Sequence, residues 1–104
     1  LGKPVLGICA GMQAIGAVFG CERIAAKEIG MTHIDVLAPC PLFDEGFEAY
    51  ELHGHAIVPN DEFEVLAKTE VSTQAIKHKR LPIYGIMFHP EVRNEAVVKR
   101  FLKM

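Results

Sequence analysis

The sequence predicts an α/β layer fold, in which helices cover a sheet that combines parallel strands with an antiparallel excursion. Three observations support this prediction. Two nearly continuous apolar runs, 3–8 and 83–88, have the composition of strands that are covered on both faces. A segment rich in small and apolar residues follows the first run, as a helix follows a strand in α/β folds. Several short strand-like segments with polar turns lie between the two runs.

Each element has a local signal. The first helix ends at Gly20, and Pro39 and Pro41 interrupt the strand that precedes them. Apolar residues at helical spacing, Ala96, Val97, Phe101 and Leu102, mark the C-terminal helix. The expected order is strand 3–8, helix 10–19, strand 29–37, one helical turn 42–46, strand 47–53, strands 64–69 and 74–78, strand 83–88 and helix 94–104.

Composition limits the classes of function. The chain has 104 residues, half of them apolar, and a net charge of −2, which suits one small domain without a nucleic-acid surface. There is no apolar run long enough to cross a membrane and no signal-peptide pattern, so we expect no membrane partner. Three cysteines without a Cys-x-x-Cys pair favour the reduced thiols of a cytoplasmic protein. Because a buried-type strand begins at once after Leu1, we expect a longer parent chain.

The segment Gly7-Ile8-Cys9-Ala10-Gly11 has the pattern of a nucleophile elbow, a sharp strand-to-helix turn that exposes one side chain. Glycines two residues before and after the cysteine are expected to remove Cβ atoms that would clash. The N–H groups and dipole at the start of a helix are expected to favour thiolate over thiol. By itself the pattern is equally compatible with a buried, inert cysteine in a tightly packed turn.

A second motif, Tyr84-Gly-Ile-Met-Phe-His-Pro-Glu-Val92, places His89 at the end of the other buried strand. If the two strands are parallel neighbours, His89 and Cys9 meet above one edge of the sheet. A histidine can take the thiol proton and return a proton to a leaving amine, and Glu91 can hold the imidazole in the right tautomer. Each residue also has an ordinary structural explanation, but together the three predict a Cys–His–Glu triad.

These two motifs, with Gln13 four residues after Cys9, resemble those of the class I (triad-type) glutamine amidotransferases. Within that family, the segments 27–30, 73–78 and 81–85 are most similar to the glutaminase part of GMP synthases. The resemblance implies a flavodoxin-like three-layer sandwich. It also implies that 1–104 is a partial amidotransferase domain that starts at the nucleophile strand and lacks the upstream strands.

The resemblance implies a role for each catalytic residue. Cys9 would attack the side-chain amide of glutamine and form a glutamyl thioester. His89 would act as general base and then general acid, and Glu91 would orient it. The backbone N–H of Ala10 would supply one oxyanion donor, and Gln13, one helical turn after Cys9, would help to hold the substrate. The reaction would supply ammonia to a synthase.

The segment Tyr50-Glu-Leu-His-Gly-His55 resembles the family's Ser-His-Gly-Asp loop, with Leu52 in place of serine and His55 in place of aspartate. From this resemblance we expect Leu52 and His53 to contact the substrate, largely through the backbone. Met12 and Met87 also replace residues that are frequent in the family. His53 and His55 alone do not predict a metal site, because no carboxylate or third histidine is recognised near them in the sequence.

The chain has no Gly-x-x-x-x-Gly-Lys-Ser/Thr phosphate loop, so no cofactor is expected in it. The resemblance implies that ATP and magnesium belong to a partner, an ATP pyrophosphatase (synthase) domain or subunit. Without an upstream glycine-rich loop for the second oxyanion donor, we expect these 104 residues alone to hydrolyse glutamine poorly. Three alternatives stay open: an amidotransferase or γ-glutamyl hydrolase with another acceptor, a non-catalytic regulatory module, and a hydrolase that shares only the elbow.

Overall fold

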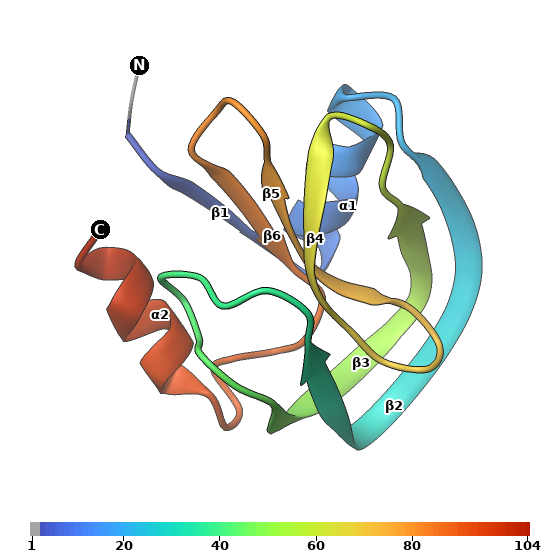
Figure 1. The fold of residues 1–104 in the computed structure, drawn as a ribbon. Coiled ribbons are helices and arrows are strands. Elements are labelled where there is room, and N and C mark those ends of the chain that lie inside the picture. The colour runs from blue at the N-terminus through green and yellow to red at the C-terminus, as the bar shows by residue number, and fades with distance from the viewer. Residues whose placement is uncertain (1–2) are drawn as a thin grey trace.

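The computed structural model describes residues 3–104, and its fold is drawn in Figure 1. Six strands and two helices make up the described part of the chain. In order they are β1 (Val5–Ile8), α1 (Ala10–Val18), β2 (Glu22–Val36), β3 (Phe47–Val58), β4 (Phe63–Lys68), β5 (Thr73–His78), β6 (Ile83–Ile86) and α2 (Glu95–Leu102).

The strands form one sheet in the order β1-β6-β5-β4-β2-β3. β1 and β6 pair in parallel, with Ile8 opposite Ile86, whereas the other neighbouring strands pair in antiparallel fashion. The carboxyl ends of β1 and β6 therefore lie side by side, although Cys9 and His89 are far apart in the sequence. The predicted α/β fold with an antiparallel excursion is confirmed.

The two helices cover opposite faces of the sheet. Met12 of α1 packs with Ile76 and Met87 in one buried cluster, while Val97 of α2 belongs to a second buried cluster with Ile86. Ile86 and Met87 are consecutive residues, and neighbouring side chains of an extended segment point to opposite faces. The result is a three-layer arrangement of helix, sheet and helix, in agreement with the predicted sandwich.

The β2–β3 hairpin is a long curved arm that wraps around α1 (Figure 1). Both strands are longer than the sequence predicts, because they continue over 22–28 and 54–58. A β-bulge between Ala25 and Glu28 puts one extra residue on β2 and bends the ribbon. The arm packs closely on α1 at Gly16, where a Cβ would lie 2.7 Å from Ile57 Cδ1.

The segment 42–46 does not form the expected helical turn. Its apolar residues Leu42 and Phe43 are buried in the core, and Phe43 pairs with Cys40 in an isolated β-bridge. Arg100 of α2 fastens the segment by donating from Nε to the carbonyl oxygen of Pro41 at 2.7 Å. Packing and this anchor replace the local hydrogen bonds of a helix. Among residues 3–104, neither helix is long and apolar enough to cross a membrane.

Candidate active site

Cys9 stands between β1 and α1 in a strained backbone conformation. Its φ is 54° and its ψ is −104°, and no other non-glycine residue in the described part of the chain has a positive φ. Its backbone N–H donates to the carbonyl oxygen of Ile86 at 2.7 Å, which ties the turn to β6. Such a conformation costs about 1–3 kcal/mol and is retained where the surroundings enforce it. The turn has the geometry expected of a nucleophile elbow.

The two glycines of the elbow differ in whether the structure has room for a Cβ atom. A Cβ on Gly7 would lie 2.6 Å from Ile15 Cδ1 and 2.7 Å from the backbone of Gly11. A Cβ on Gly11 would meet nothing within 4 Å. The expectation that both glycines avoid a clash is therefore wrong for Gly11. Only Gly7 is required, because the first turn of α1 rests directly on its backbone.

His89 follows the end of β6 and is held by two contacts. Its backbone N–H donates to the carbonyl oxygen of Tyr50 at 2.9 Å, and its Nδ1 lies 2.9 Å from Glu91 Oε2. The Nδ1–H donates to the carboxylate, which leaves the lone pair of Nε2 free to accept a proton. The backbone N–H of Glu91 and, more weakly, the His89 imidazole hold the pKa of Glu91 below its ordinary value against the opposing effect of burial.

One backbone oxygen of β3 lies against the side chains of both Cys9 and His89. Cys9 Sγ is 3.7 Å from the carbonyl oxygen of Leu52, and His89 Nε2 is 3.4 Å from the same atom. The fold thus brings Cys9 and His89 to one point at the sheet edge. The Leu52 side chain is half exposed, so the contact of this residue with the pair is made by its carbonyl group. The family resemblance predicts a backbone contact of Leu52 with substrate, but a backbone atom leaves no pattern in the sequence that predicts its contacts with Cys9 and His89.

Burial raises the pKa of the Cys9 thiol above its ordinary value. The backbone N–H of Ala10 acts in the opposite direction, and the negative charges of Glu51 and Glu91 raise the pKa further. The helix start thus favours the thiolate as expected, but burial is the larger effect, so the pKa of the Cys9 thiol lies above its ordinary value. A base is therefore needed to remove the thiol proton, and the imidazole of His89 faces the same carbonyl oxygen.

Gln13 lies one turn along α1 from Cys9. Its Nε2 donates to the carbonyl oxygen of His55 at 3.1 Å, so the side chain bridges α1 and the arm beside Cys9. Ala10, the first residue of α1, is exposed and turns its N–H toward the Cys9 side chain. Substrate contacts by Gln13 and Ala10 stay predictions, in positions that border the reactive pair.

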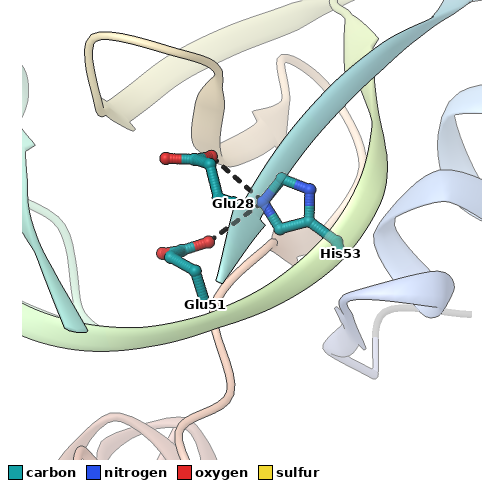
Figure 2. Close-up of side chains that lie close together, drawn as sticks. All are labelled: Glu28, Glu51 and His53. Carbon is teal, nitrogen blue, oxygen red and sulfur yellow. Dashed lines mark hydrogen bonds and ion pairs between the residues drawn. The ribbon is translucent and has the colours of Figure 1, made fainter. Parts of the chain in front are cut away.

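The side chain of His53 points into a buried polar cluster and away from solvent (Figure 2). Its Nε2 lies 3.0 Å from Glu28 Oε1 and 3.1 Å from Glu51 Oε1. Any contact of His53 with substrate must therefore come from its backbone. The expectation that no carboxylate lies near this histidine is wrong. Glu51 is two residues away, and Glu28 stands directly opposite His53 in the β2–β3 register.

The acidic members of this cluster were missed by the sequence reasoning. Burial, together with the neighbouring charge of Glu28, raises the pKa of Glu51 to about 7. A signal for Glu51 was present, because residues two apart on a strand share one face. No such signal exists for Glu28, whose position depends on a strand register and a bulge.

A family model described as Glutamine amidotransferase class-I matches residues 1–104. A curated relative from Methanocaldococcus jannaschii, a subunit of the glutamine-hydrolyzing GMP synthase, is 37% identical over 97% of this chain and 60% of its own length. The glutamine-hydrolyzing GMP synthase of Eremothecium gossypii is 40% identical over 99% of this chain and 21% of its own length. The chain thus spans about 60% of the Methanocaldococcus jannaschii protein and about a fifth of the longer synthase.

Solved structures give the same picture. A protein from Thermoplasma acidophilum, assigned as a GMP synthase subunit, superposes with a TM-score of 0.91 at 30% identity. The match covers 99% of this chain and 57% of that one. A glutamine amidotransferase from Thermotoga maritima superposes with a TM-score of 0.78 at 22% identity over 96% of this chain and 45% of that one, which shows a shared fold.

Proposed function

The chain belongs to the class I glutamine amidotransferase family, and we propose that its Cys9, His89 and Glu91 release ammonia from glutamine for the synthesis of GMP. The observation that carries this proposal is the meeting of Cys9 Sγ and His89 Nε2 at the carbonyl oxygen of Leu52. The 2.9 Å contact between His89 Nδ1 and Glu91 supports the assignment of His89 as the base.

The reaction proceeds in two halves. His89 Nε2 takes the proton of the Cys9 thiol, and the sulfur attacks the side-chain carbonyl carbon of glutamine. The tetrahedral intermediate collapses as His89 returns the proton to the departing nitrogen, which leaves as ammonia. Water then attacks the thioester, giving its proton to His89. Glutamate leaves as that proton returns to the Cys9 sulfur.

Neighbouring groups assist the charges that develop. The backbone N–H of Ala10 supplies one oxyanion donor for the tetrahedral intermediate. The Leu52 carbonyl accepts from Nε2–H while His89 is protonated, so it stabilises the imidazolium form. Gln13 borders the pocket for the amino-acid end of the substrate.

The ammonia acceptor belongs to a partner. Relatives at 35–40% identity are GMP synthases or subunits of them, so we propose a synthase subunit or domain that binds ATP and magnesium as the recipient of the ammonia. The amidotransferase chain itself works without a cofactor in this scheme, because a thiol, an imidazole and a carboxylate suffice for the chemistry.

The test uses the full-length protein with and without its synthase. A glutamine-like chloroketone is expected to alkylate Cys9 and not Cys21 or Cys40, as read by peptide mass spectrometry. Cys9→Ala abolishes glutamine hydrolysis, while Cys21→Ala, the matched control, retains it. Ammonia transfer to xanthosine monophosphate separates a GMP synthase from other acceptors. A full-length protein whose Cys9 is not labelled would be a non-catalytic module, and the proposal would be wrong.

A further inference from the structure

A buried polar cluster of two carboxylates and one imidazole lies outside the proposed triad. Glu28, Glu51 and His53 have side-chain exposures of 8%, 1% and 1%. Their ligand-type atoms lie within 4.8 Å of one another, and among residues 3–104 no other group of three acidic, histidine or cysteine side chains is so arranged. Figure 2 shows both carboxylates directed at the same nitrogen of the ring.

The tautomer of His53 determines what this nitrogen offers. Nδ1 lies 3.0 Å from the carbonyl oxygen of His55, so it carries a hydrogen and donates to that oxygen. In the neutral ring, Nε2 then presents a lone pair to the carboxylate oxygens of Glu28 and Glu51. A backbone carbonyl that fixes the other ring nitrogen in this way is the usual support of a metal-binding histidine.

The spacing of the three atoms fits a metal ion. Nitrogen and oxygen ligands lie about 2.0–2.2 Å from zinc, so two ligands are separated by about 2.8–3.1 Å at octahedral angles and by about 3.3–3.6 Å at tetrahedral angles. The distances from His53 Nε2 to Glu28 Oε1 and Glu51 Oε1 are 3.0 and 3.1 Å, which match the octahedral separation and lie a few tenths of an ångström below the tetrahedral one. The three ligand atoms are therefore close enough together to coordinate one ion, which would replace the donors that Ser72 and Gln74 now direct at Glu28 Oε1.

Buried oxygens without a hydrogen-bond partner at the cluster are a second, independent observation in favour of a metal ion. Within the described chain, Glu51 Oε2 and Gln74 Oε1 are buried without a hydrogen-bond partner. Gln74 is fully buried, and its amide lies against the cluster, with Nε2 3.1 Å from Glu28 Oε1. Buried oxygens normally have a partner, and a cation supplies one. The amide of Gln74 can present its oxygen as a further ligand after a half-turn.

The charge of the cluster and the cavity beside it are both consistent with a bound cation. With Glu51 ionised, the two carboxylates and the neutral imidazole carry a charge of −2, which one divalent ion neutralises, whereas a buried uncompensated charge is strongly unfavourable. Glu28 also lines a cavity of about 430 Å³ whose other lining residues include Asp35 and Glu70. This cavity reaches the cluster at Glu28, and its acidic residues would attract a cation to that side of it.

We propose that Glu28, Glu51 and His53 bind a divalent transition metal, with zinc as the ion that best suits one imidazole and two carboxylates. The ion joins β2 to β3 immediately beside the bulge. It lies next to Leu52, whose carbonyl group contacts Cys9 and His89, so it would fix that oxygen in place. The inference stands on these residues alone and does not depend on the proposed reaction.

The experiment uses the full-length protein after treatment with a chelator. Titration with Zn²⁺ by calorimetry is expected to give one equivalent per chain, and Zn²⁺ is expected to raise the midpoint of thermal unfolding. Co²⁺ is expected to give a visible d–d spectrum without the thiolate charge-transfer band that Cys9 would produce. Glu51→Gln is expected to weaken Zn²⁺ binding at least tenfold and to remove the thermal shift.

The matched control is Glu48→Gln, which alters an exposed carboxylate 2.6 Å from His33 Nδ1 and should leave the stoichiometry and affinity unchanged. Glu51→Met, an apolar side chain of similar length, serves if the glutamine variant is poorly folded by circular dichroism. The proposal is overturned if wild type binds no zinc, if both Glu51 variants bind as tightly as wild type, or if cobalt gives a thiolate band. If wild type binds no zinc, the carboxylates and the imidazole of the cluster share a proton instead.

Discussion

Gly7→Ala and Gly11→Ala make the same chemical change on the two sides of Cys9, yet we expect opposite effects on stability. A Cβ on Gly7 would lie 2.7 Å from both the carbonyl carbon and the oxygen of Gly11, which are backbone atoms at the start of α1. The Ile15 side chain, at 2.6 Å, can rotate, but the helix backbone must move as a unit. Overpacking of this kind costs about 1–3 kcal/mol, and an obstruction by backbone places Gly7→Ala near the upper end.

Gly11→Ala is the matched control. Its Cβ meets nothing within 4 Å, and Gly11 lies in α1 with an ordinary helical φ. Replacing a glycine by alanine in a helix stabilises it by about 0.5–1 kcal/mol. The two variants are therefore expected to differ by about 3–4 kcal/mol in the free energy of unfolding, which is a factor of roughly 10²–10³ in the folded-to-unfolded ratio.

Chemical denaturation of the full-length protein, followed by circular dichroism, measures this difference. Because Cys9 is the N-cap of α1, we also expect Gly7→Ala to reduce the rate of chloroketone labelling of Cys9 and Gly11→Ala to leave it close to that of wild type. Equal unfolding free energies for the two variants would show that the turn relaxes around the added methyl group. The assignment of Gly7 as the required glycine would then be wrong.

Three further predictions concern the reactive edge. Because burial raises the pKa of the Cys9 thiol, its thiolate forms only at higher pH. The pH at which iodoacetamide alkylation of Cys9 reaches half its maximal rate should therefore lie above the corresponding pH for free cysteine. A half-maximal rate at the same or a lower pH contradicts this prediction. Glu91→Gln should lower kcat by about 10² or more, since the amide no longer fixes the His89 tautomer, whereas Glu95→Gln on α2 should leave kcat unchanged in the same ammonia-release assay. Gln13→Ala removes the 3.1 Å hydrogen bond to the carbonyl oxygen of His55, so it should lower the free energy of unfolding by about 0.5–1.5 kcal/mol. It should also raise KM for glutamine, and an unchanged KM would exclude Gln13 from the substrate pocket.

The parts of the fold with a strong local pattern could be predicted from the sequence. The apolar runs that contain β1 and β6 are covered by the two helices, and the glycine-flanked cysteine marks the turn into α1. The first half of β2 could not be predicted in this way. The segment 22–28 carries charges and alanines, and it is a strand because it pairs with β3.

The candidate site likewise contains residues that the sequence indicates and contacts that only the fold produces. The side chains of Cys9, His89 and Glu91 could be singled out because the proposed chemistry requires those residue types at the ends of two strands. The family resemblance indicates Leu52, but its contribution is a carbonyl group, which every residue has, so only the curvature of the arm shows that this oxygen meets Cys9 and His89. The meeting of Glu28 with His53 depends on a one-residue bulge, and its absence would turn the carboxylate to the other face.

The position of β3 at the end of the strand order has a consequence for self-association. A terminal strand exposes unpaired carbonyl and N–H groups, which invite pairing with a strand of another molecule. Here the carbonyl of Tyr50 accepts from the backbone N–H of His89, and the carbonyl of Leu52 is covered by Cys9 and His89. The segments that carry the reactive groups thus also shield this margin of the sheet, so resistance to aggregation and the geometry of the reactive pair depend on the same few contacts.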